Sequence, residues 1–341
     1  MAVNLADQFS DHKISMSKKV LRTEEKDDKV IIYCADNTTY EGDILVGADG
    51  AYSGVRQSLY KRMEEKGILP KVDLESFSIG YVTMVGVARP QNPKRYTQLS
   101  ENISHFSTVV GENNKSWSVV SVADNSICWG VGVQLPKSQA MEQQFRNSEW
   151  GPESNEVMMA EFRDKPCPWG GTMGDVIDDT PKELISKVFL EEKVFKTWYH
   201  GRTVLLGDAC HKMLPSAGQG AVNAMQDAVV LANCLYNMPD SRPSTITAAF
   251  QEYFRQRSDR AAMQVDRSRI WGKIMSGHTW SDRLARHLLL NYIPYWFQLQ
   301  TSIKTFEYRP QIAWLPLAKE RGTGHALPQE GKRDGHNKSL I

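Results

Sequence analysis

Apolar and polar residues alternate along the N-terminal part of the chain, a pattern typical of half-buried β-strands. Two strand-like segments lie on either side of a polar turn at 26–28, and Asp36-Asn37 marks another hairpin turn. Residues 44–46 are continuously apolar, which predicts a strand buried on both faces. Ser53 then caps a predicted helix that ends near Glu65.

The middle of the chain has the pattern of a β-rich unit. Residues 77–88 predict one strand, and residues 116–123 and 127–135 predict a hairpin with its turn at 124–126. A more helical stretch, a loop rich in Gly and Pro and a short helix are then predicted at 138–162, 166–174 and 181–190.

The second half of the chain returns to a strand–loop–helix order. Residues 203–206 predict a short strand, a Pro- and Gly-rich loop follows, and a helix begins near Gly220. A long amphipathic helix is predicted at 245–275, and the sequence beyond 316 is polar. We therefore expect an α/β fold with an α+β insert. The expected divisions are one domain at 1–74 continued at 196–275, a β-rich domain inserted at 75–195, and a helical region with a polar tail at 276–341.

The charge and the cysteine content exclude several classes of protein. Lys and Arg number 41 against 40 Asp and Glu, so no basic excess points to nucleic acid. The five cysteines form no C-x-x-C pair, which argues against a disulfide framework or a zinc site and indicates a reducing compartment. We therefore expect a cytoplasmic protein without a bound metal.

The most apolar C-terminal stretch lies at 288–297, where Asn291 and Pro294 interrupt it. It is too short to span a bilayer. Peripheral membrane contact through this stretch stays open, and the sequence leaves the oligomeric state undetermined.

The loop after the predicted strand at 203–206, here called the GD loop (residues 207–219), has the chemistry of a ligand cradle. Asp208 stands at the carboxyl end of a buried strand, where α/β sheets place ligands and where a carboxylate accepts hydrogen bonds from sugar-type hydroxyls. Gly218 and Gly220 let backbone N–H groups approach a flat or anionic ligand, next to the positive end of a helix. The alternative is an empty strand–loop–helix joint, which is a common structure.

An earlier loop, the DG loop (residues 47–53), repeats this order. Asp49-Gly50 follows a buried strand, and Arg56 lies in the first turn of the next helix, where the macrodipole disfavours a cation. A nearby anion would offset the unfavourable interaction of Arg56 with the helix dipole, so one hypothesis is that a phosphate-bearing ligand binds here. The alternative is a salt bridge from Arg56 to Asp49 or Asp43.

Together the two loops resemble those of the FAD-dependent aromatic-hydroxylase family, which has the para-hydroxybenzoate hydroxylase fold. The first motif is present as Gly47-Ala48-Asp49-Gly50, Ser53, Val55 and Arg56. The second is present as Gly207-Asp208-Ala209, His211, Pro215, Gly218-Gln219-Gly220-Ala221, Asn223 and Asp227. Beyond these motifs, the sequence is most similar to those of fungal monooxygenases of secondary-metabolite pathways.

The resemblance implies an enzyme in which NADPH reduces FAD and O2 then delivers one oxygen atom to a small organic substrate. Hydroxylation and epoxidation of a polyketide, aromatic or terpenoid compound both stay open, and no catalytic acid or base is named. Asp208 would hold ribityl or pyrophosphate-proximal hydroxyls, and residues 218–221 would face the flavin pyrimidine. The implied cofactor-binding residues are Asp49, Gly50, Arg56, Asp208, Pro215, Gly218, Gly220, Ala221 and Asn223.

The sequence departs from this family at its start. The family opens with a βαβ unit whose Gly-rich turn binds the FAD pyrophosphate, and no G-x-G-x-x-G opens this chain. We therefore expect an incomplete Rossmann-like domain, short by roughly a hundred residues, that binds FAD weakly or not at all by itself. The alternative function is that of a FAD-less relic, either a binding protein or a non-redox isomerase or cyclase.

Four further residues have side chains that could act in catalysis or line a substrate pocket, and a structural role is favoured for each. His211 is expected to pack or hydrogen-bond rather than catalyse, and Cys210 to be a small buried residue rather than a nucleophile. Tyr81 and Trp129 lie on predicted strands of the insert, where core packing is favoured over a substrate pocket.

Overall fold

The computed structural model describes residues 14–26, 28–112, 115–135, 152–277, 279–316 and residue 327. Most of the helical stretch predicted at 138–162 lies outside these residues, and its described part contains helix α5 (Pro152–Ala160). The polar tail predicted beyond 316 also lies outside them, apart from residue 327. The described strands form three sheets.

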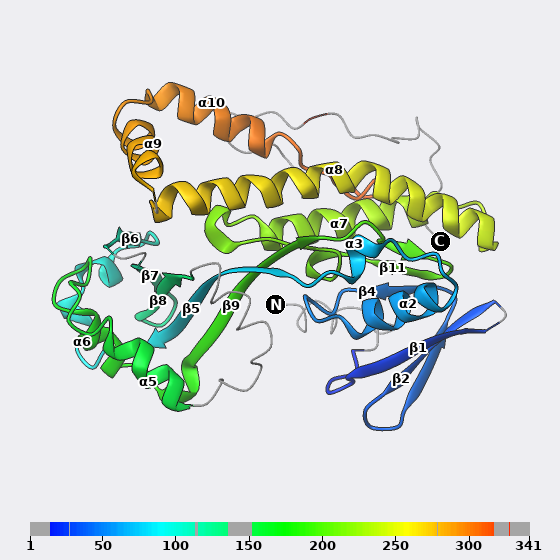
Figure 1. The fold of residues 1–341 in the computed structure, drawn as a ribbon, viewed down its shortest axis with the longest axis horizontal. Helices are drawn as coiled ribbons and strands as arrows, with labels where there is room; N and C mark the ends of the chain where they lie inside the picture. Colours follow the sequence, from blue (N-terminus) through cyan, green and yellow to red (C-terminus); the bar gives the residue numbers. More distant parts are fainter. Residues whose placement is uncertain are drawn as a thin grey trace.

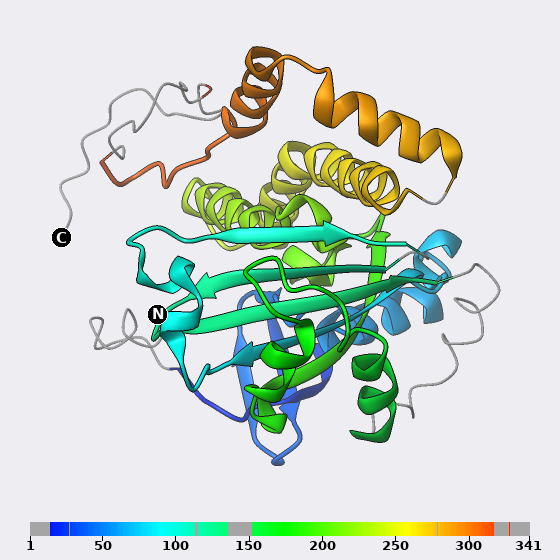
Figure 2. The same ribbon diagram turned by 90° about the vertical axis from the view of Figure 1, so that its left-hand side faces the viewer.

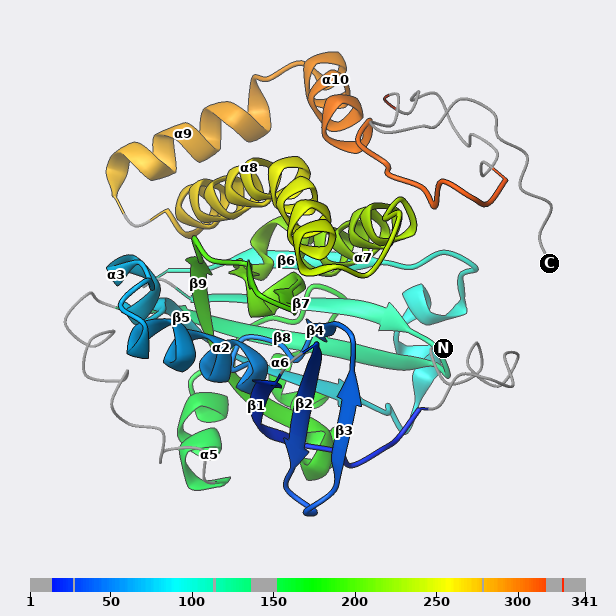
Figure 3. The same ribbon diagram turned by 90° about the vertical axis from the view of Figure 1, so that its right-hand side faces the viewer.

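A three-stranded antiparallel sheet comes first along the chain, as the alternating pattern predicts. It comprises β1 (Val20–Lys26), β2 (Lys29–Cys34) and β3 (Thr39–Gly42), seen at the lower right of Figure 1 and the bottom of Figure 3. The turn between β2 and β3 contains Asn37 at φ 64°. Asn tolerates this left-handed conformation better than most residues, so the predicted hairpin turn is confirmed.

A second small sheet joins two distant parts of the sequence. Strand β11 (Thr203–Leu205) lies between β10 (Tyr199–His200) and β4 (Leu45–Gly47), and it pairs with β4 in parallel. Burial of β4 on both faces was a wrong prediction: Val46 is 39% exposed, so the face of the strand on which it lies is not fully covered. Strand β4 is also an edge strand of the described sheet. Parallel pairing brings the carboxyl ends of β4 and β11 to the same edge.

The largest sheet has six strands in the order β12-β9-β5-β8-β7-β6. Its members are β5 (Ser78–Ala88), β6 (Phe106–Val110), β7 (Lys115–Val122), β8 (Ser126–Gln134), β9 (Ile185–Val194) and β12 (His211–Lys212). The strand predicted at 77–88 and the hairpin at 116–135 are confirmed. Figure 2 shows these strands face on.

The short helix predicted at 181–190 is wrong. A 3₁₀ turn, η3 (Lys182–Leu184), is followed at once by strand β9. Strand β9 pairs with β5 from Ile185 opposite Gly86 to Glu192 opposite Ser78. This long ladder with a distant segment overrides the local helical pattern.

The four C-terminal helices lie on one side of the strands, and shorter helices lie on the other (Figure 1). Helices α7 (Gly220–Tyr236) and α8 (Pro243–Ser276) lie side by side above the strands, and α9 (Trp280–Asn291) and α10 (Tyr295–Phe306) lie beyond α8 (Figures 1 and 2). The shorter α2 (Gly54–Glu65), α3 (Lys71–Leu74) and α6 (Met173–Asp178) lie lower. In the described part of the chain, no helix is both long and apolar enough to cross a membrane.

Two apolar clusters form the core. One joins α2, β11, α7 and α8, with Leu59, Leu205 and Phe250 fully buried. The other joins the large sheet to α5 and α6, with Met84 and Trp129 at its centre. The separation of the two clusters agrees with a β-rich unit inserted into another domain, and the boundaries at 74, 195 and 275 stay a prediction.

Candidate cofactor site

The DG and GD loops lie side by side because they follow the paired strands β4 and β11. Between them is a cavity of about 580 Å³, within the size range of small-molecule sites. It is lined by Ala48, Gly50, Leu206, Gly207, Asp208, Met213, Leu214, Pro215, Gly218, Gly220, Ala221 and Ala224. Six of the nine residues expected to bind a cofactor are in this lining: Gly50, Asp208, Pro215, Gly218, Gly220 and Ala221.

Glycine is required at two turns of the GD loop. Gly218 has φ 62° and Gly207 has φ 60°, conformations that L side chains rarely adopt. A Cβ at Gly207 would also lie only 3.0 Å from the Cβ of Ala224 on α7. The GD loop therefore packs directly against the helix whose N-terminus completes the cavity.

The polar groups of the cavity suit a ligand with both hydroxyl and electron-rich groups. Asp208 is half-buried, and within the described residues its carboxylate accepts no hydrogen bond. Helix α7 begins at Gly220 after Gln219, which provides no side-chain cap, and no acidic residue lies in the first turn. The cavity thus combines a hydrogen-bond acceptor with the positive end of a 17-residue helix.

Asp49 organises the start of α2. One carboxylate oxygen accepts a hydrogen bond from the Ser53 hydroxyl, and the other accepts one from the amide of Val55 at 3.2 Å. The Ser53 hydroxyl in turn accepts from the Arg56 amide at 2.8 Å, so Ser53 is the N-cap that the sequence predicts.

Arg56 connects the two loops from behind the cavity. Arg56 is 5% exposed, and its guanidinium donates to the carbonyl oxygens of Ala209 at 2.9 Å and Ala51 at 2.6 Å. It also lies 4.2 Å from the ring centre of Phe195. Burial lowers the pKa of this guanidinium. Among the described residues Arg56 forms no salt bridge with Asp49 or Asp43: it bonds to these carbonyl oxygens, and the negative charge of Asp49 acts on it only at longer range. Contact of Arg56 with a bound anion stays a prediction.

Asn223 is also held within the protein. Its side-chain amide donates to the carbonyl of Gln219 at 2.9 Å, and its oxygen accepts from Arg257 at 3.0 Å. Because Asn223 is 2% exposed, the observed role is to shape the first turn of α7. Direct contact of Asn223 with a cofactor stays a prediction.

A buried ionic network lies beneath the GD loop. The Asp227 carboxylate accepts from Arg257 Nε at 2.7 Å, from His211 Nε2 at 2.6 Å and from the Gly207 amide at 2.9 Å. Burial alone would raise the pKa of Asp227, but the bonds from His211 and Arg257 outweigh it and lower the pKa. His211 therefore packs and hydrogen-bonds, as the sequence predicts, whereas the contribution of Arg257 was missed because nothing in its helical spacing points to Asp227.

Cys210, His211 and Asp227 place their candidate metal-ligand atoms within 4.8 Å of one another. Both Asp227 oxygens already accept hydrogen bonds, and a guanidinium lies against one of them. Burial raises the pKa of the Cys210 thiol well above its ordinary value, which disfavours the thiolate that a metal requires. His211 and Asp227 are therefore best described as a hydrogen-bonded pair, beside which the Cys210 thiol donates to the Gly207 carbonyl.

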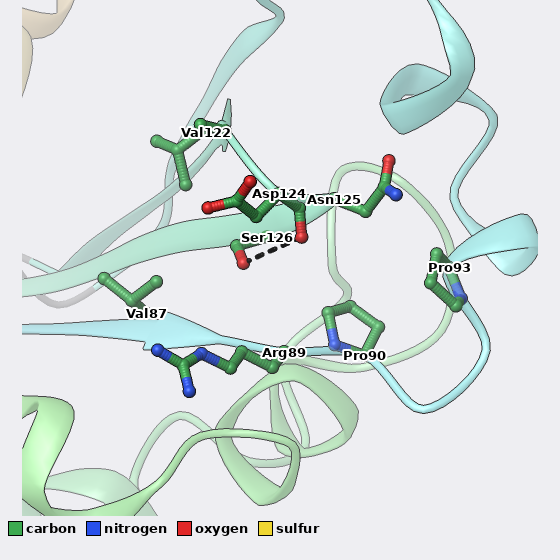
Figure 4. A pocket seen from close by; sticks show the side chains of 9 residues that line it. Val87, Arg89, Pro90, Pro93, Val122, Asp124, Asn125 and Ser126 are labelled. Atoms are coloured by element: carbon green, nitrogen blue, oxygen red, sulfur yellow. Dashed lines mark hydrogen bonds between the residues drawn. The ribbon is translucent and has the colours of Figure 1, made fainter.

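A separate cavity of about 470 Å³ lies where β5 and the β7–β8 hairpin end (Figure 4). It is lined by Val87, Arg89, Pro90, Pro93, Val122, Ala123, Asp124, Asn125 and Ser126, none of which is an expected cofactor residue. Trp129 belongs to the core, at 1% exposed, and its indole N–H donates to the Thr180 hydroxyl at 2.8 Å.

Comparison with known proteins agrees with this geometry. Residues 3–268 match the family described as the FAD binding domain. The chain belongs to this family. The FAD-dependent monooxygenase paxM of Penicillium paxilli is 32% identical over 92% of this chain and 64% of its own length. The FAD-dependent monooxygenase ausM of Penicillium brasilianum is 28% identical over 96% of this chain and 67% of its own length.

Solved structures show the same fold at lower identity. HpxO of Klebsiella pneumoniae, complexed with FAD and uric acid, matches with a TM-score of 0.57 and 24% identity, covering 84% of this chain and 66% of that one. FqzB matches with a TM-score of 0.60 and 18% identity, covering 89% of this chain and 67% of that one. This FAD-binding-domain chain thus spans between 51% and 67% of the length of eight curated relatives that match it.

Proposed function

We propose that this protein is a FAD-dependent monooxygenase and that the cavity between the DG and GD loops holds the flavin end of FAD. One observation carries the proposal. Two loops far apart in the sequence line one cavity, which contains the Asp208 carboxylate and the uncapped N-terminus of α7. The relatives named FAD-dependent monooxygenases support it.

The residues of the cavity fit this part of the cofactor. The Asp208 carboxylate would accept hydrogen bonds from the ribityl hydroxyls. Gly218 and Gly220 would lie against the flat ring system, and the amides of the first turn of α7 would stabilise negative charge on it. Bound FAD supplies the redox chemistry, and the protein binds and orients it.

NADPH as the reductant and O2 as the source of the inserted oxygen are part of the same proposal. So are a small polyketide, aromatic or terpenoid substrate and a cytoplasmic site of action. The reductant, the oxidant and the substrate class rest on the motif resemblance and on the relatives' names. The cytoplasmic site rests on the cysteine content. Within this proposal, Asp49, Arg56 and Asn223 contribute by holding the loops and the start of α7.

The test is a titration of the purified chain with FAD, in which binding is measured by flavin fluorescence and visible absorbance. Asp208→Ala should weaken FAD binding by about tenfold or more, since a charge-assisted hydrogen bond is lost. Asp124→Ala, which removes a carboxylate from the other cavity, is the matched control and should bind FAD as the parent chain does. Equal affinity of both variants and the parent would contradict the assignment of the cavity.

The alternative function is a FAD-less relic that binds a metabolite or catalyses a non-redox rearrangement. A colourless, well-folded protein that shows no saturable FAD binding and still converts a metabolite would favour this alternative.

We also propose peripheral membrane contact through α9 and α10. Trp280 is 77% exposed, Tyr295 77% and Trp296 64%, and such amphipathic aromatic side chains favour the interface of a bilayer. Two cations on the same helices, Arg283 and Lys304, are also exposed, which suits anionic headgroups.

This contact is tested by co-sedimentation with vesicles of phosphatidylcholine and phosphatidylserine. Replacing Tyr295 and Trp296 by Ser should abolish binding, whereas Phe106→Ser, a change at an equally exposed aromatic on β6, should leave it intact. Absence of vesicle binding by the parent chain, or a change in its oligomeric state instead, would overturn the proposal.

A further inference from the structure

Arg257 of α8 holds one face of α7 through four donated hydrogen bonds. Its Nε bonds to Asp227, one Nη bonds to the Gln226 side chain at 3.1 Å, and the other bonds to the Asn223 side chain at 3.0 Å and carbonyl at 3.3 Å. Positions 223, 226 and 227 share a helical face, so one guanidinium spans the first turns of α7. Arg257 is fully buried.

Asp227 transmits this restraint to the GD loop. One of its oxygens is bonded to Arg257, and the other accepts from the Gly207 amide and from His211 on β12. Gly207 immediately precedes Asp208, whose side chain lines the cavity. The same residue therefore fixes the helix on one side of the cavity and the turn on its other side.

We propose that Asp227, held by Arg257, is a positioning residue that sets the Asp208 carboxylate relative to the N-terminus of α7. Both groups would contact the flavin end of FAD, so the functional meaning rests on the proposed function. The positioning itself is a property of the protein without cofactor.

Asp227 can hold this position because no other described acceptor can replace its carboxylate as the partner of three donors. Arg257, His211 and the Gly207 amide all direct donors at Asp227, and all three residues are buried away from water. A neutral amide at position 227 would leave the guanidinium without its counter-ion and would turn an N–H group toward one of these donors. The turn at Gly207 would then separate from α7.

Hydrogen exchange of the intact chain, followed by mass spectrometry, tests this inference. In Asp227→Asn, the peptide that contains Gly207 should lose protection by about tenfold. The matched control is Asp73→Asn. Asp73 is also buried and also accepts from two backbone amides, those of Lys196 at 2.7 Å and Thr197 at 2.9 Å, but it lies outside the cavity lining.

Peptides of β7 and β8 report global opening in both variants. Loss of protection that is equal in all peptides, or equal at Gly207 in the two variants, would show that Asp227 contributes only to stability and would overturn the inference. If Asp227→Asn does not fold, Arg257→Lys replaces it, since lysine keeps the charge and loses the fork. Arg257→Lys should also lower the protection of the Gly207 peptide from exchange, but by less than Asp227→Asn. Unchanged protection of this peptide would likewise overturn the inference.

The two proposals fail separately. If the Gly207 peptide responds and Asp208→Ala binds FAD as the parent chain does, the positioning holds and the proposed cofactor site is wrong. If FAD binds and the peptide does not respond, the positioning is wrong.

Discussion

The guanidinium of Arg56 donates a hydrogen bond to the carbonyl oxygen of Ala209 at 2.9 Å, although 153 positions separate the two residues. Arg56 belongs to the helix after the DG loop, and Ala209 belongs to the GD loop. This single bond therefore ties together the two loops that line the proposed cofactor cavity.

Replacing Arg56 by Ala should lower the free energy of unfolding by about 3 kcal/mol, because the carbonyl oxygens of Ala209 and Ala51 lose a charged donor in a buried site. Urea denaturation measures this change. Arg22→Ala, which removes an exposed guanidinium 3.4 Å from the Tyr33 ring, should change stability by no more than about 0.5 kcal/mol. If Arg56→Lys instead lowers FAD affinity at unchanged stability, the direct anion contact predicted from the sequence is favoured.

Gly86 lies where β5 crosses the core of the large sheet. A Cβ there would come within 2.6 Å of the Trp129 indole. Gly86→Ala should therefore destabilise the fold by about 1–3 kcal/mol, as overpacking of a core does. Gly80 lies on the same strand, and a Cβ there would meet no other atom within 4 Å, so Gly80→Ala is the control and should be tolerated. Similar melting temperatures for the two variants would contradict this account of the core.

The buried network predicts a pH dependence of stability. The pKa of Asp227 lies below its ordinary value of 3.8 in the folded protein, so its ionised form contributes stability at pH values above 3.8. That contribution should be lost as the pH falls from 3.8 through the lower folded-state pKa. Asp227→Asn should be less stable at neutral pH and should lose less stability on acidification, as denaturant titrations at several pH values will show. Parallel curves for the two proteins would refute the assignment.

The cysteines should differ in reactivity. Cys210 is fully buried and burial raises the pKa of its thiol, whereas Cys128 is partly exposed. A thiol reagent should therefore modify Cys128 in the native protein and reach Cys210 only on unfolding. Peptide mapping after brief labelling measures the order, and early modification of Cys210 would show that the GD loop opens readily.

The sequence by itself determined the local elements and the chemistry of the loops. Alternation predicted β1 to β3, Ser53 predicted the start of α2, and the Pro and Gly residues of the GD loop predicted a loop between strand and helix. These features depend on near neighbours in the chain, so the pattern of residues contains the information.

Only the tertiary structure decided what depends on distant partners. Strand β9 forms because it pairs with β5, although its local pattern predicted a helix. Arg56, Asp49 and Asn223 were expected to contact a cofactor, and the structure shows that their hydrogen bonds hold backbone and neighbouring side chains. The Asp227–Arg257 pair likewise became visible only when α7 packed against α8, because the charge of a side chain does not reveal which buried partner will offset it.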